Sequence, residues 1–402
     1  MSGIAILGFG VVGSGVAEVI ARNRLHIDQK LHSNLELKYI LDRKDFPQSP
    51  FADLIVHDFS LIENDSAVDI VVETIGGSEI AREFTERALR AGKSVVTSNK
   101  ELVAVHGYEL MSLAREKGVS YLYEASVGGG IPIIRPLKQC LAANEISEIY
   151  GILNGTTNYI LTRMIGAGLS FEDALAEAQA HGYAEADPTA DVDGIDACRK
   201  ICILASLAFG RHVDPSAVST EGIKRVSLSD VNYASSCGCK IKLLGRAVMG
   251  QDGKIRIFVA PHLIPEQDPL AGVEAVFNAI TVRGNAIGNV MFYGQGAGKL
   301  PTASAVVADV MEAVSRKSDP KYLDWGPGGE DVAAPKDDGI YTWYVRAKEP
   351  DALPEGMKQL RFPGEPKEER AFLTQPLTRD DLEKILRNVQ VCAAFRLLKT
   401  DQ

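Results

Sequence analysis

The first 22 residues place an apolar segment, a glycine-rich turn and a helical segment in that order, which strongly restricts the fold. Gly3–Leu7 (GIAIL) has the composition of a buried strand, Gly8–Gly13 reads GFGVVG, and a helical pattern continues to Arg22. Glycines at these spacings allow a tight turn, close approach of a pyrophosphate and packing of the helix on the strand. We therefore expect a dinucleotide cofactor here, contacted by Gly8, Phe9, Gly10, Val11, Val12 and Gly13.

The end of the second predicted strand, Leu35–Leu41, carries conflicting signals about the cofactor. The strand is followed directly by Asp42, Arg43 and Lys44. An acidic residue at this point would hydrogen-bond the ribose of NAD, whereas basic residues favour the 2′-phosphate of NADP. We expect Arg43 to contact the cofactor, and both NADP and NAD stay open.

Strands and helices then alternate at a spacing typical of a doubly wound parallel sheet, so an α/β, Rossmann-like domain is predicted. The predicted elements are strand Asp69–Ile75, helix Ser78–Ala91, strand Ser94–Thr97, a helix from about Glu101 to Lys117, and strand Val119–Tyr123. Gly76 and Lys100 follow strands, and ligands bind at this carboxyl edge of such sheets. A solvated loop lysine is the alternative for Lys100.

Residues His181–Lys200 (HGYAEADPTADVDGIDACRK) join an acidic segment to the start of an apolar helix. Five carboxylates lie within twelve residues: Glu185, Asp187, Asp191, Asp193 and Asp196. Asp196 and Lys200 are four residues apart and share one face of the helix. Burial lowers the pKa of a lysine while a nearby carboxylate raises it, so such a pair is suited to proton transfer. An ion pair with only a structural role is the alternative.

The rest of the chain predicts an α+β substrate domain with an open sheet, with strands near Ile241–Val248, Ile255–Ala260 and Ala275–Arg283. Residues 1–130 with a return helix at 298–318 are assigned to the dinucleotide-binding domain. Residues 131–297 are assigned to substrate binding and catalysis; the family resemblance described below adds dimerisation to this domain. Residues 339–402 show a shortened βαββαβ pattern and are assigned to a small C-terminal domain.

Charge and composition argue against several classes of protein. The 402 residues carry a net charge of −10 without a run of Lys or Arg, which argues against a nucleic-acid partner. No apolar run of 18 residues occurs and the amino terminus enters a strand directly, so neither a membrane span nor a signal peptide is expected. The six cysteines include no CxxC pair, which favours a reducing, cytoplasmic compartment.

These segments together resemble the homoserine dehydrogenase family from about Gly3 to Ser315. The resemblance rests on GFGVVG, TSNKELVA, YEASVGGGIPII, GILNGTTNYIL, GYAEADPTADVDGIDACRK, PHLIPEQDPLAGVEAVFNAI and YGQGAGKLPTASAVVADV. It implies reversible reduction of L-aspartate 4-semialdehyde to L-homoserine with NAD(P)H, on the route to threonine, methionine and isoleucine.

Two other functions are weighed against this one. A semialdehyde dehydrogenase would need a nucleophilic cysteine, and no cysteine follows a strand in a polar turn suited to that role. A non-enzymatic NADP-binding sensor would have no need to keep both Lys100 and Lys200.

The resemblance also assigns roles to residues. The proton-transfer lysine falls on Lys200, the second active-site lysine on Lys100, and the substrate-binding acids on Glu185 and Asp196. Further expected contacts are Thr156 and Tyr183 with the substrate, and Gly76, Lys100, Gly182 and Gly298 with the cofactor. A homodimer or a dimer of dimers is implied.

Two other parts of the resemblance concern a cation and an effector. A monovalent cation, sodium or potassium, would be held through Glu124, Val127, Gly129 and Ile131; the residues alone equally fit a hinge. Many family members end in an ACT domain whose first strand leads into an Asp-x-Pro-Gly-type turn. The corresponding turn, Glu349–Leu353, has Asp351 where glycine is expected, so a truncated ACT-like domain without an effector site is predicted.

Overall fold

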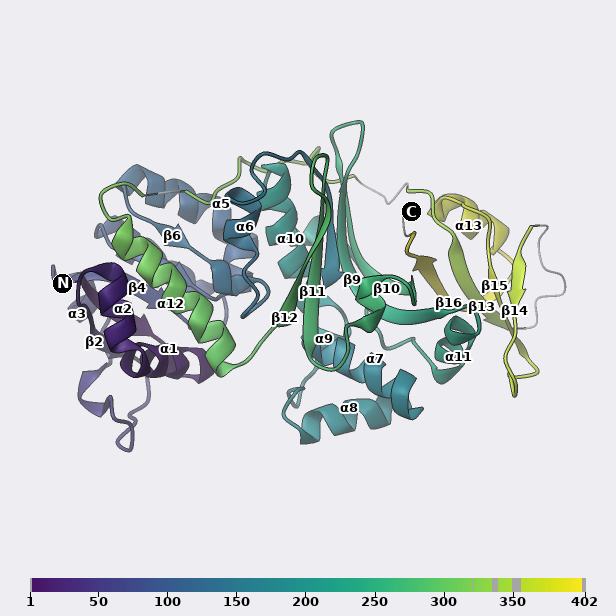
Figure 1. Cartoon of the computed structure of the whole chain (residues 1–402), viewed down its shortest axis with the longest axis horizontal. Coiled ribbons are helices and arrows are strands. Elements are labelled where there is room, and N and C mark those ends of the chain that lie inside the picture. Colours follow the sequence, from purple (N-terminus) through teal and green to yellow (C-terminus); the bar gives the residue numbers. More distant parts are fainter. Residues whose placement is uncertain (1, 321, 335–338, 349–355, 400–402) are drawn as a thin grey trace. The chain divides into compact units, whose positions relative to one another are not determined.

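Figure 1 shows the computed structural model of the chain, which describes residues 2–320, 322–334, 339–348 and 356–399. The chain forms two compact units, each assembled from segments that are distant in the sequence. Unit 1 comprises Met1–Glu145, Cys202–Pro215 and Gly294–Gly329, and unit 2 comprises Ile146–Ile201, Ser216–Tyr293 and Glu330–Gln402. Among the described residues, no helix is both long and apolar enough to cross a membrane.

The described residues of unit 1 form a six-stranded parallel sheet in the order β3-β2-β1-β4-β5-β6. Its strands are β1 (Ser2–Leu7), β2 (Leu35–Leu41), β3 (Ile55–Val56), β4 (Val68–Glu73), β5 (Ser94–Thr97) and β6 (Tyr121–Leu122). Its helices are α1 (Val11–Arg22), α2 (Arg24–Leu31), α3 (Ser60–Glu63), α4 (Glu79–Arg90), α5 (Lys100–Lys117), α6 (Ile134–Lys138) and α12 (Lys299–Ser315).

This sheet confirms the predicted Rossmann-like fold. The strands read as continuous apolar runs because helices cover both faces, and Ile4, Ile6, Val71 and Val72 are fully buried. The chain reverses its direction of progression across the sheet between β1 and β4, the position at which doubly wound sheets bind ligands. Helix α12 returns to this unit and packs on α1, where a side chain at Gly15 would lie 2.8 Å from the carbonyl oxygen of Lys299.

The described residues of unit 2 form a mixed ten-stranded sheet in the order β12-β11-β7-β9-β10-β16-β13-β15-β14, with β8 beside β10. Its first strands are β7 (Ile146–Ile152), β8 (Ser219–Thr220), β9 (Cys239–Met249), β10 (Ile255–Pro265), β11 (Phe277–Gly284) and β12 (Gly288–Gln295). Its helices are α7 (Gly155–Ala167), α8 (Phe171–Ala180), α9 (Thr189–Val192), the first half of α10 (Ile195–Phe209), which continues into unit 1 from Cys202, α11 (Leu228–Ser236) and α13 (Arg379–Ile385). This second sheet agrees with the predicted α+β class, whereas α2, α11 and β12 were not predicted.

The C-terminal segment continues the sheet of unit 2. Its strands are β13 (Trp343–Lys348), β14 (Lys358–Leu360), β15 (Glu369–Leu373) and β16 (Gln390–Leu397), and β16 pairs in parallel with β10. The four strands follow the antiparallel order β16-β13-β15-β14. The predicted effector turn, Glu349–Leu353, lies outside the described residues, so the ACT-like character of this segment stays a prediction.

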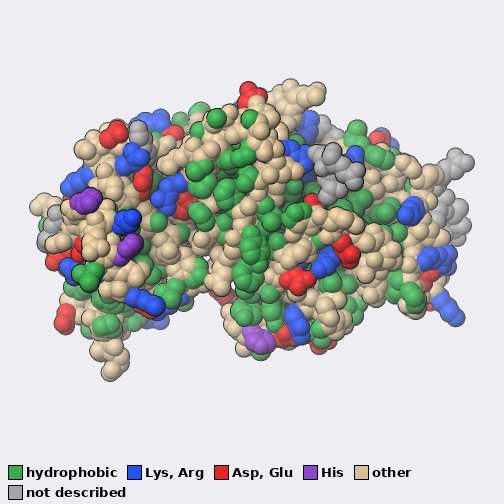
Figure 2. Space-filling view, in the orientation of Figure 1, with side chains coloured by type: hydrophobic (Ala, Val, Ile, Leu, Met, Phe, Trp, Pro, Cys, Tyr) green, Lys and Arg blue, Asp and Glu red, His purple; other side chains and the backbone are tan. Residues whose placement is uncertain are grey.

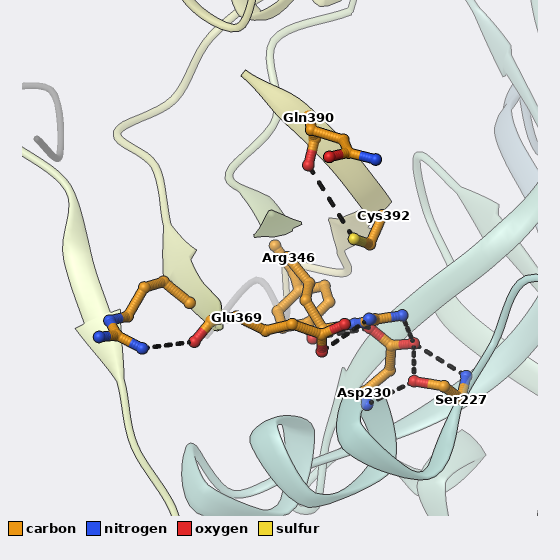
Figure 3. A network of polar contacts seen from close by, with 8 residues as sticks. Ser227, Asp230, Arg346, Glu369, Gln390 and Cys392 are labelled. Carbon is orange, nitrogen blue, oxygen red and sulfur yellow. Dashed lines mark hydrogen bonds and ion pairs between the residues drawn. The ribbon is translucent and has the colours of Figure 1, made fainter. Parts of the chain in front are cut away.

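A buried ion pair joins this segment to α11 (Figure 3). The guanidinium of Arg346 on β13 donates to both carboxylate oxygens of Asp230, over 2.7 and 2.9 Å, and to Glu369 over 2.9 Å. Tyr344 donates its hydroxyl to the same Asp230 carboxylate over 2.8 Å. Asp230 is fully buried and Arg346 nearly so. Each charge is paired and hydrogen-bonded, and loss of either partner would leave the other buried without compensation.

Candidate active site

The glycine-rich turn after β1 is tightly packed on one side and open on the other. Gly8 has a φ of 87°, and a side chain at Gly13 would lie 1.9 Å from the carbonyl oxygen of Gly8. A side chain at Gly10, by contrast, would meet no described atom within 4 Å. Thr74 donates its hydroxyl to the carbonyl of Gly8 over 2.9 Å and fixes the turn. The amino end of α1 is thus presented to an open side, as pyrophosphate binding requires.

The carboxylate of Asp42 ties the end of β2 to this turn. One oxygen accepts the backbone N–H of Phe9 over 2.7 Å, and the other accepts that of Lys44 over 3.0 Å. The side chain of Arg43 is exposed, and among the described residues it has no hydrogen-bond or ion-pair partner. Asp42 therefore shapes the turn, while the guanidinium of Arg43 is available to a ligand.

Lys100 is the first residue of α5, at the carboxyl edge of the sheet. The preceding residue, Asn99, caps the helix by accepting the backbone N–H of Leu102 over 3.1 Å. Its side-chain amide donates to the carbonyl of Gly77 over 2.7 Å. Gly76, the residue before Gly77, borders open space. The structure thus places Gly76 in the loop after β4 and Lys100 at the start of α5, and Asn99 hydrogen-bonds to both segments.

The carboxylate of Glu124 serves as a helix cap, which the sequence did not indicate. It is buried and accepts the backbone N–H groups of Ile133, Ile134 and Arg135 over 2.6, 2.7 and 3.0 Å, at the start of α6. Among the described residues, no cluster of three or more His, Cys, Asp or Glu side chains is placed to hold a metal ion. The Glu124 carboxylate is therefore already engaged by backbone N–H groups.

The glycines of the same loop allow a close approach to the residues before α12. Gly129 has a φ of 54°, and a side chain there would lie 2.5 Å from the carbonyl oxygen of Gly296. Val127 and Ile131 are buried on either side. Gly298, the predicted cofactor contact, caps α12 with a φ of 127°. Positive φ angles and close contacts explain why glycine occupies these positions, whether or not a ligand binds there.

In unit 2, the predicted catalytic pair is a buried ion pair on α10. The ammonium group of Lys200 donates to the carboxylate of Asp196 over 2.7 Å and to the carbonyl oxygen of Leu153 over 2.8 Å. Lys200 is 8% exposed and Asp196 is 3% exposed. Leu153 lies between β7 and α7, so the lysine is oriented by two separate elements.

Asn154 brings a second carboxylate to this pair. Its side-chain amide donates to Asp196 over 2.9 Å and to Asp191 over 2.7 Å, while its carbonyl oxygen accepts the backbone N–H of Thr157. Burial raises the pKa of the Asp191 carboxyl, and the nearby charge of Asp196 raises it further. Sequence reasoning recognised Asn154 only as part of a polar turn; its position directly after a predicted strand was the available signal.

The remaining acids of the segment have other surroundings. Asp193 forms an ion pair with Lys224 at 2.7 Å, and Asp187 accepts the backbone N–H of Thr189. Glu185 is exposed. The structure therefore joins two of the five acids, Asp191 and Asp196, through Asn154 and gives the other three different partners or surroundings.

Thr156 and Tyr183 are in contact at the amino end of α7. The hydroxyl of Thr156 donates to the backbone carbonyl of Tyr183 over 2.7 Å. The ring of Tyr183 is 44% exposed and lies 4.9 Å from that of Tyr159, measured between ring centroids. Gly182, just before it, has a φ of 73°. An exposed aromatic ring and an exposed carboxylate, Glu185, thus lie two residues apart in the chain.

A separate cavity of about 720 Å³ lies in unit 2, between the loop 219–225 and the C-terminal segment. Asp193 is on its wall, but none of the predicted catalytic residues lines it. The predicted catalytic chemistry is therefore not located there.

Comparison with known proteins gives consistent results over most of the chain. The model of the homoserine dehydrogenase family matches residues 132–311, and that of the homoserine dehydrogenase NAD-binding domain matches residues 8–124. The chain is 45% identical over 320 residues to the homoserine dehydrogenase of Pseudomonas aeruginosa, covering 79% of this chain and 74% of that protein.

Solved structures agree with these matches. A homoserine dehydrogenase from Thiobacillus denitrificans superposes with a TM-score of 0.90 at 35% identity, covering 99% of this chain and 98% of that one. A hyperthermophilic archaeal homoserine dehydrogenase in complex with NADPH superposes with a TM-score of 0.66 at 30% identity, covering 80% of this chain and 99% of that one.

Proposed function

This chain belongs to the homoserine dehydrogenase family, and we propose how its residues share the NAD(P)-dependent reduction of L-aspartate 4-semialdehyde to L-homoserine. The nicotinamide supplies the hydride in this direction and accepts it in the other. The protein must therefore bind the cofactor, hold the substrate and move one proton to or from the substrate oxygen.

Lys200 is proposed as the proton donor in reduction and the acceptor in oxidation. The observation that carries this assignment is the ion pair with Asp196 at 2.7 Å, together with the hydrogen bond to the carbonyl of Leu153 at 2.8 Å. These two contacts orient the ammonium group in a buried setting. A positive charge held there also stabilises the alkoxide that develops when hydride reaches the aldehyde carbon.

Two acidic residues, together with the amino end of α7, are proposed to hold the zwitterionic substrate. Glu185 and Asp196 suit its ammonium group, because charge-assisted hydrogen bonds to carboxylates are strong. Thr156 and Tyr183 would contact the remainder of the molecule. Asn154 supports this arrangement by holding Asp196 in place. Lys100 is proposed as the second active-site lysine.

Binding of both nicotinamide cofactors is proposed, with Arg43 contacting the 2′-phosphate of NADP. The exposure of the Arg43 guanidinium and the engagement of Asp42 with Phe9 and Lys44 support this choice. Gly8–Gly13 would bind the pyrophosphate, with Gly76, Gly182 and Gly298 as further contacts.

A monovalent cation, sodium or potassium, is proposed at the loop of Glu124, Val127, Gly129 and Ile131, held through backbone carbonyls. The capping role of the Glu124 carboxylate supports carbonyls rather than the side chain as ligands. We further propose a homodimer or a dimer of dimers, and a cytoplasmic location.

The decisive experiment is the initial rate of L-homoserine oxidation with NAD and with NADP, each in sodium and in potassium salts. Turnover with both cofactors supports the cofactor proposal, and a difference between the two salts supports the cation site. Equal rates in both salts and in a salt of a large organic cation would remove the cation proposal. Oxidation of the semialdehyde that depends on phosphate, without oxidation of homoserine, would indicate a semialdehyde dehydrogenase.

A further inference from the structure

Glu73 ends β4 at the carboxyl edge of the unit 1 sheet and is fully buried. Nothing in its sequence context assigns it a role in the reaction. One carboxylate oxygen accepts the backbone N–H of Ile75 over 2.6 Å, and the other accepts the hydroxyl of Thr97 over 2.5 Å. The carboxylate therefore joins the loop after β4 to the end of β5.

Two further residues extend this connection to both cofactor loops. The hydroxyl of Thr97 accepts the backbone N–H of Asn99 over 2.9 Å. The side chain of Asn99 donates to the carbonyls of Ile75 and Gly77 and caps α5, which begins at Lys100. Gly76 borders open space between these contacts. The loop 75–77 and the start of α5 thus share one hydrogen-bonded network with Glu73 at its base.

The hydrogen bonds around Glu73 favour an ionised carboxylate. A backbone N–H can only donate, so the oxygen facing Ile75 must accept. The hydroxyl of Thr97 accepts from Asn99 and can donate its single proton to an ionised Glu73 carboxylate. A proton on the Glu73 oxygen facing Ile75 would oppose the backbone N–H, and a proton on the other oxygen would displace the Thr97 hydroxyl proton from this hydrogen bond, so protonation disturbs the buried network.

Burial opposes that ionisation. It raises the pKa of Glu73 to about 7, although the hydrogen bonds from Thr97, Ile75 and Asn99 lower it. The titratable neighbour on β6 is Tyr121, whose phenol stays neutral because burial and the charge of Glu73 raise its pKa well above the ordinary value. The charged residues at the start of α5 are Lys100 and Glu101. The network therefore changes its charge within the physiological pH range.

We propose that Glu73 is a positioning residue for the nicotinamide cofactor, whose ionised carboxylate holds loop 75–77 and the start of α5 in the geometry that binds it. This inference rests on the proposed cofactor site at the same sheet edge. Protonation of Glu73 loosens both loops, so cofactor affinity falls as the pH drops through 7. Cofactor binding, in turn, lowers the pKa of Glu73.

The test is the dissociation constant of NADH, measured by nicotinamide fluorescence on the full chain between pH 5.5 and 9. NADH is preferred to NADPH because a phosphate monoester itself titrates near pH 6. A decrease of one unit in the pKa of Glu73 on binding corresponds to about a tenfold weaker affinity at low pH. We expect this change in the wild-type protein. Glu73→Gln should bind about tenfold more weakly at pH 8 and should lack the part of the pH dependence that the wild type owes to Glu73.

Thr97 provides a matched pair of variants. Thr97→Ser keeps the hydroxyl and should retain the wild-type affinity and pH profile, whereas Thr97→Val removes it and should weaken NADH binding several-fold. His57, which contacts the backbone carbonyl of Asp42, also titrates in this range. Its contribution is common to all four proteins and cancels in the comparison.

Three outcomes would overturn the inference: wild-type affinity and pH dependence in Glu73→Gln, a flat profile in the wild type, or equal affinities in Thr97→Val and Thr97→Ser. If Glu73→Gln does not fold, as judged by circular dichroism, the Thr97 pair decides. Homoserine oxidation by the wild-type protein is measured in parallel. Normal turnover with a flat binding profile rejects only the role of Glu73, whereas normal NADH binding without turnover rejects only the proposed catalytic assignments.

Discussion

Asn154 and Asp196 are 42 residues apart in the chain, and the side-chain amide of Asn154 donates to Oδ2 of Asp196 over 2.9 Å. The same oxygen accepts a hydrogen bond from the ammonium group of Lys200 over 2.7 Å. One carboxylate oxygen therefore receives two donors, one of which is the proposed proton-transfer group. This contact links the end of a strand to the catalytic helix and leads to the first two predictions.

Lys200→Ala should lose about 10²- to 10⁴-fold in kcat for homoserine oxidation, because it removes the general acid–base group. NADH binding, followed by fluorescence, should stay near that of the wild type. Lys254→Ala, on an exposed lysine of the same unit outside the proposed site, is the control. A folded Lys200→Ala variant that keeps more than a tenth of the wild-type kcat would show that proton transfer takes place elsewhere, with Lys100 next to test.

Asn154→Ala should reduce kcat by about 10- to 100-fold, the effect of losing a hydrogen bond to a charged group. Asp191 and Asp196 then face each other without a shared donor, so the carboxyl pKa of Asp191 rises further above its ordinary value. The acidic limb of the pH–rate profile should accordingly move to higher pH. Asn64→Ala, which removes an exposed side-chain amide in unit 1, is the control. An unchanged profile would mean that Asn154 has no influence on these acids.

Arg43→Ala should weaken NADP binding by about 1.5–3 kcal/mol, the scale of a charge-assisted hydrogen bond, and leave NAD binding nearly unchanged. Calorimetric titration with each cofactor measures both constants. Arg24→Ala, on an exposed arginine of α2, should affect neither. Equal losses for NAD and NADP would assign Arg43 a role other than recognition of the 2′-phosphate.

Arg346→Met should lower the free energy of unfolding by about 3–5 kcal/mol, because it leaves the buried Asp230 carboxylate without its counter-charge. Asp230→Asn should have a similar effect, because it leaves the buried Arg346 guanidinium without its counter-charge. The double variant should recover part of the loss, since neither charge is then left unpaired. Urea unfolding of the four proteins measures this coupling, and additive effects would contradict it.

Asp309→Asn should change how stability depends on pH. Burial raises the pKa of Asp309 from 3.8 to about 7. Between these values the folded protein keeps a proton that the unfolded chain has lost, so the free energy of unfolding falls as the pH rises through this window. Above pH 7 the contribution of Asp309 to the free energy of unfolding is lost completely.

The asparagine variant does not titrate and should lack this contribution, which is on the order of a few kcal/mol. Its side-chain oxygen can still accept the backbone N–H of Glu124, as the carboxylate does. Thermal unfolding at pH 5.5 and pH 8 should therefore show a smaller difference for the variant than for the wild type. Identical differences in the two proteins would contradict the raised pKa.

Local patterns in the sequence determined several parts of this protein. The strand, GFGVVG and helix at residues 3–22 predict the turn of the dinucleotide-binding unit, because the glycine spacing follows from backbone geometry. The pairing of Asp196 with Lys200 follows from helical periodicity alone. The alternation of strands and helices predicted the parallel sheet, since each apolar strand must be covered on both faces.

Only the tertiary structure decided which distant side chains meet. It placed Asn154 between Asp191 and Asp196, joined Glu73 to Thr97, and turned the Glu124 carboxylate toward the start of α6. It also joined the C-terminal strands to the sheet of unit 2 through β10 and β16. These contacts depend on the path of the chain, because a buried polar group is satisfied by whichever donor the fold brings to it. Residue spacing in the sequence carries no record of that path.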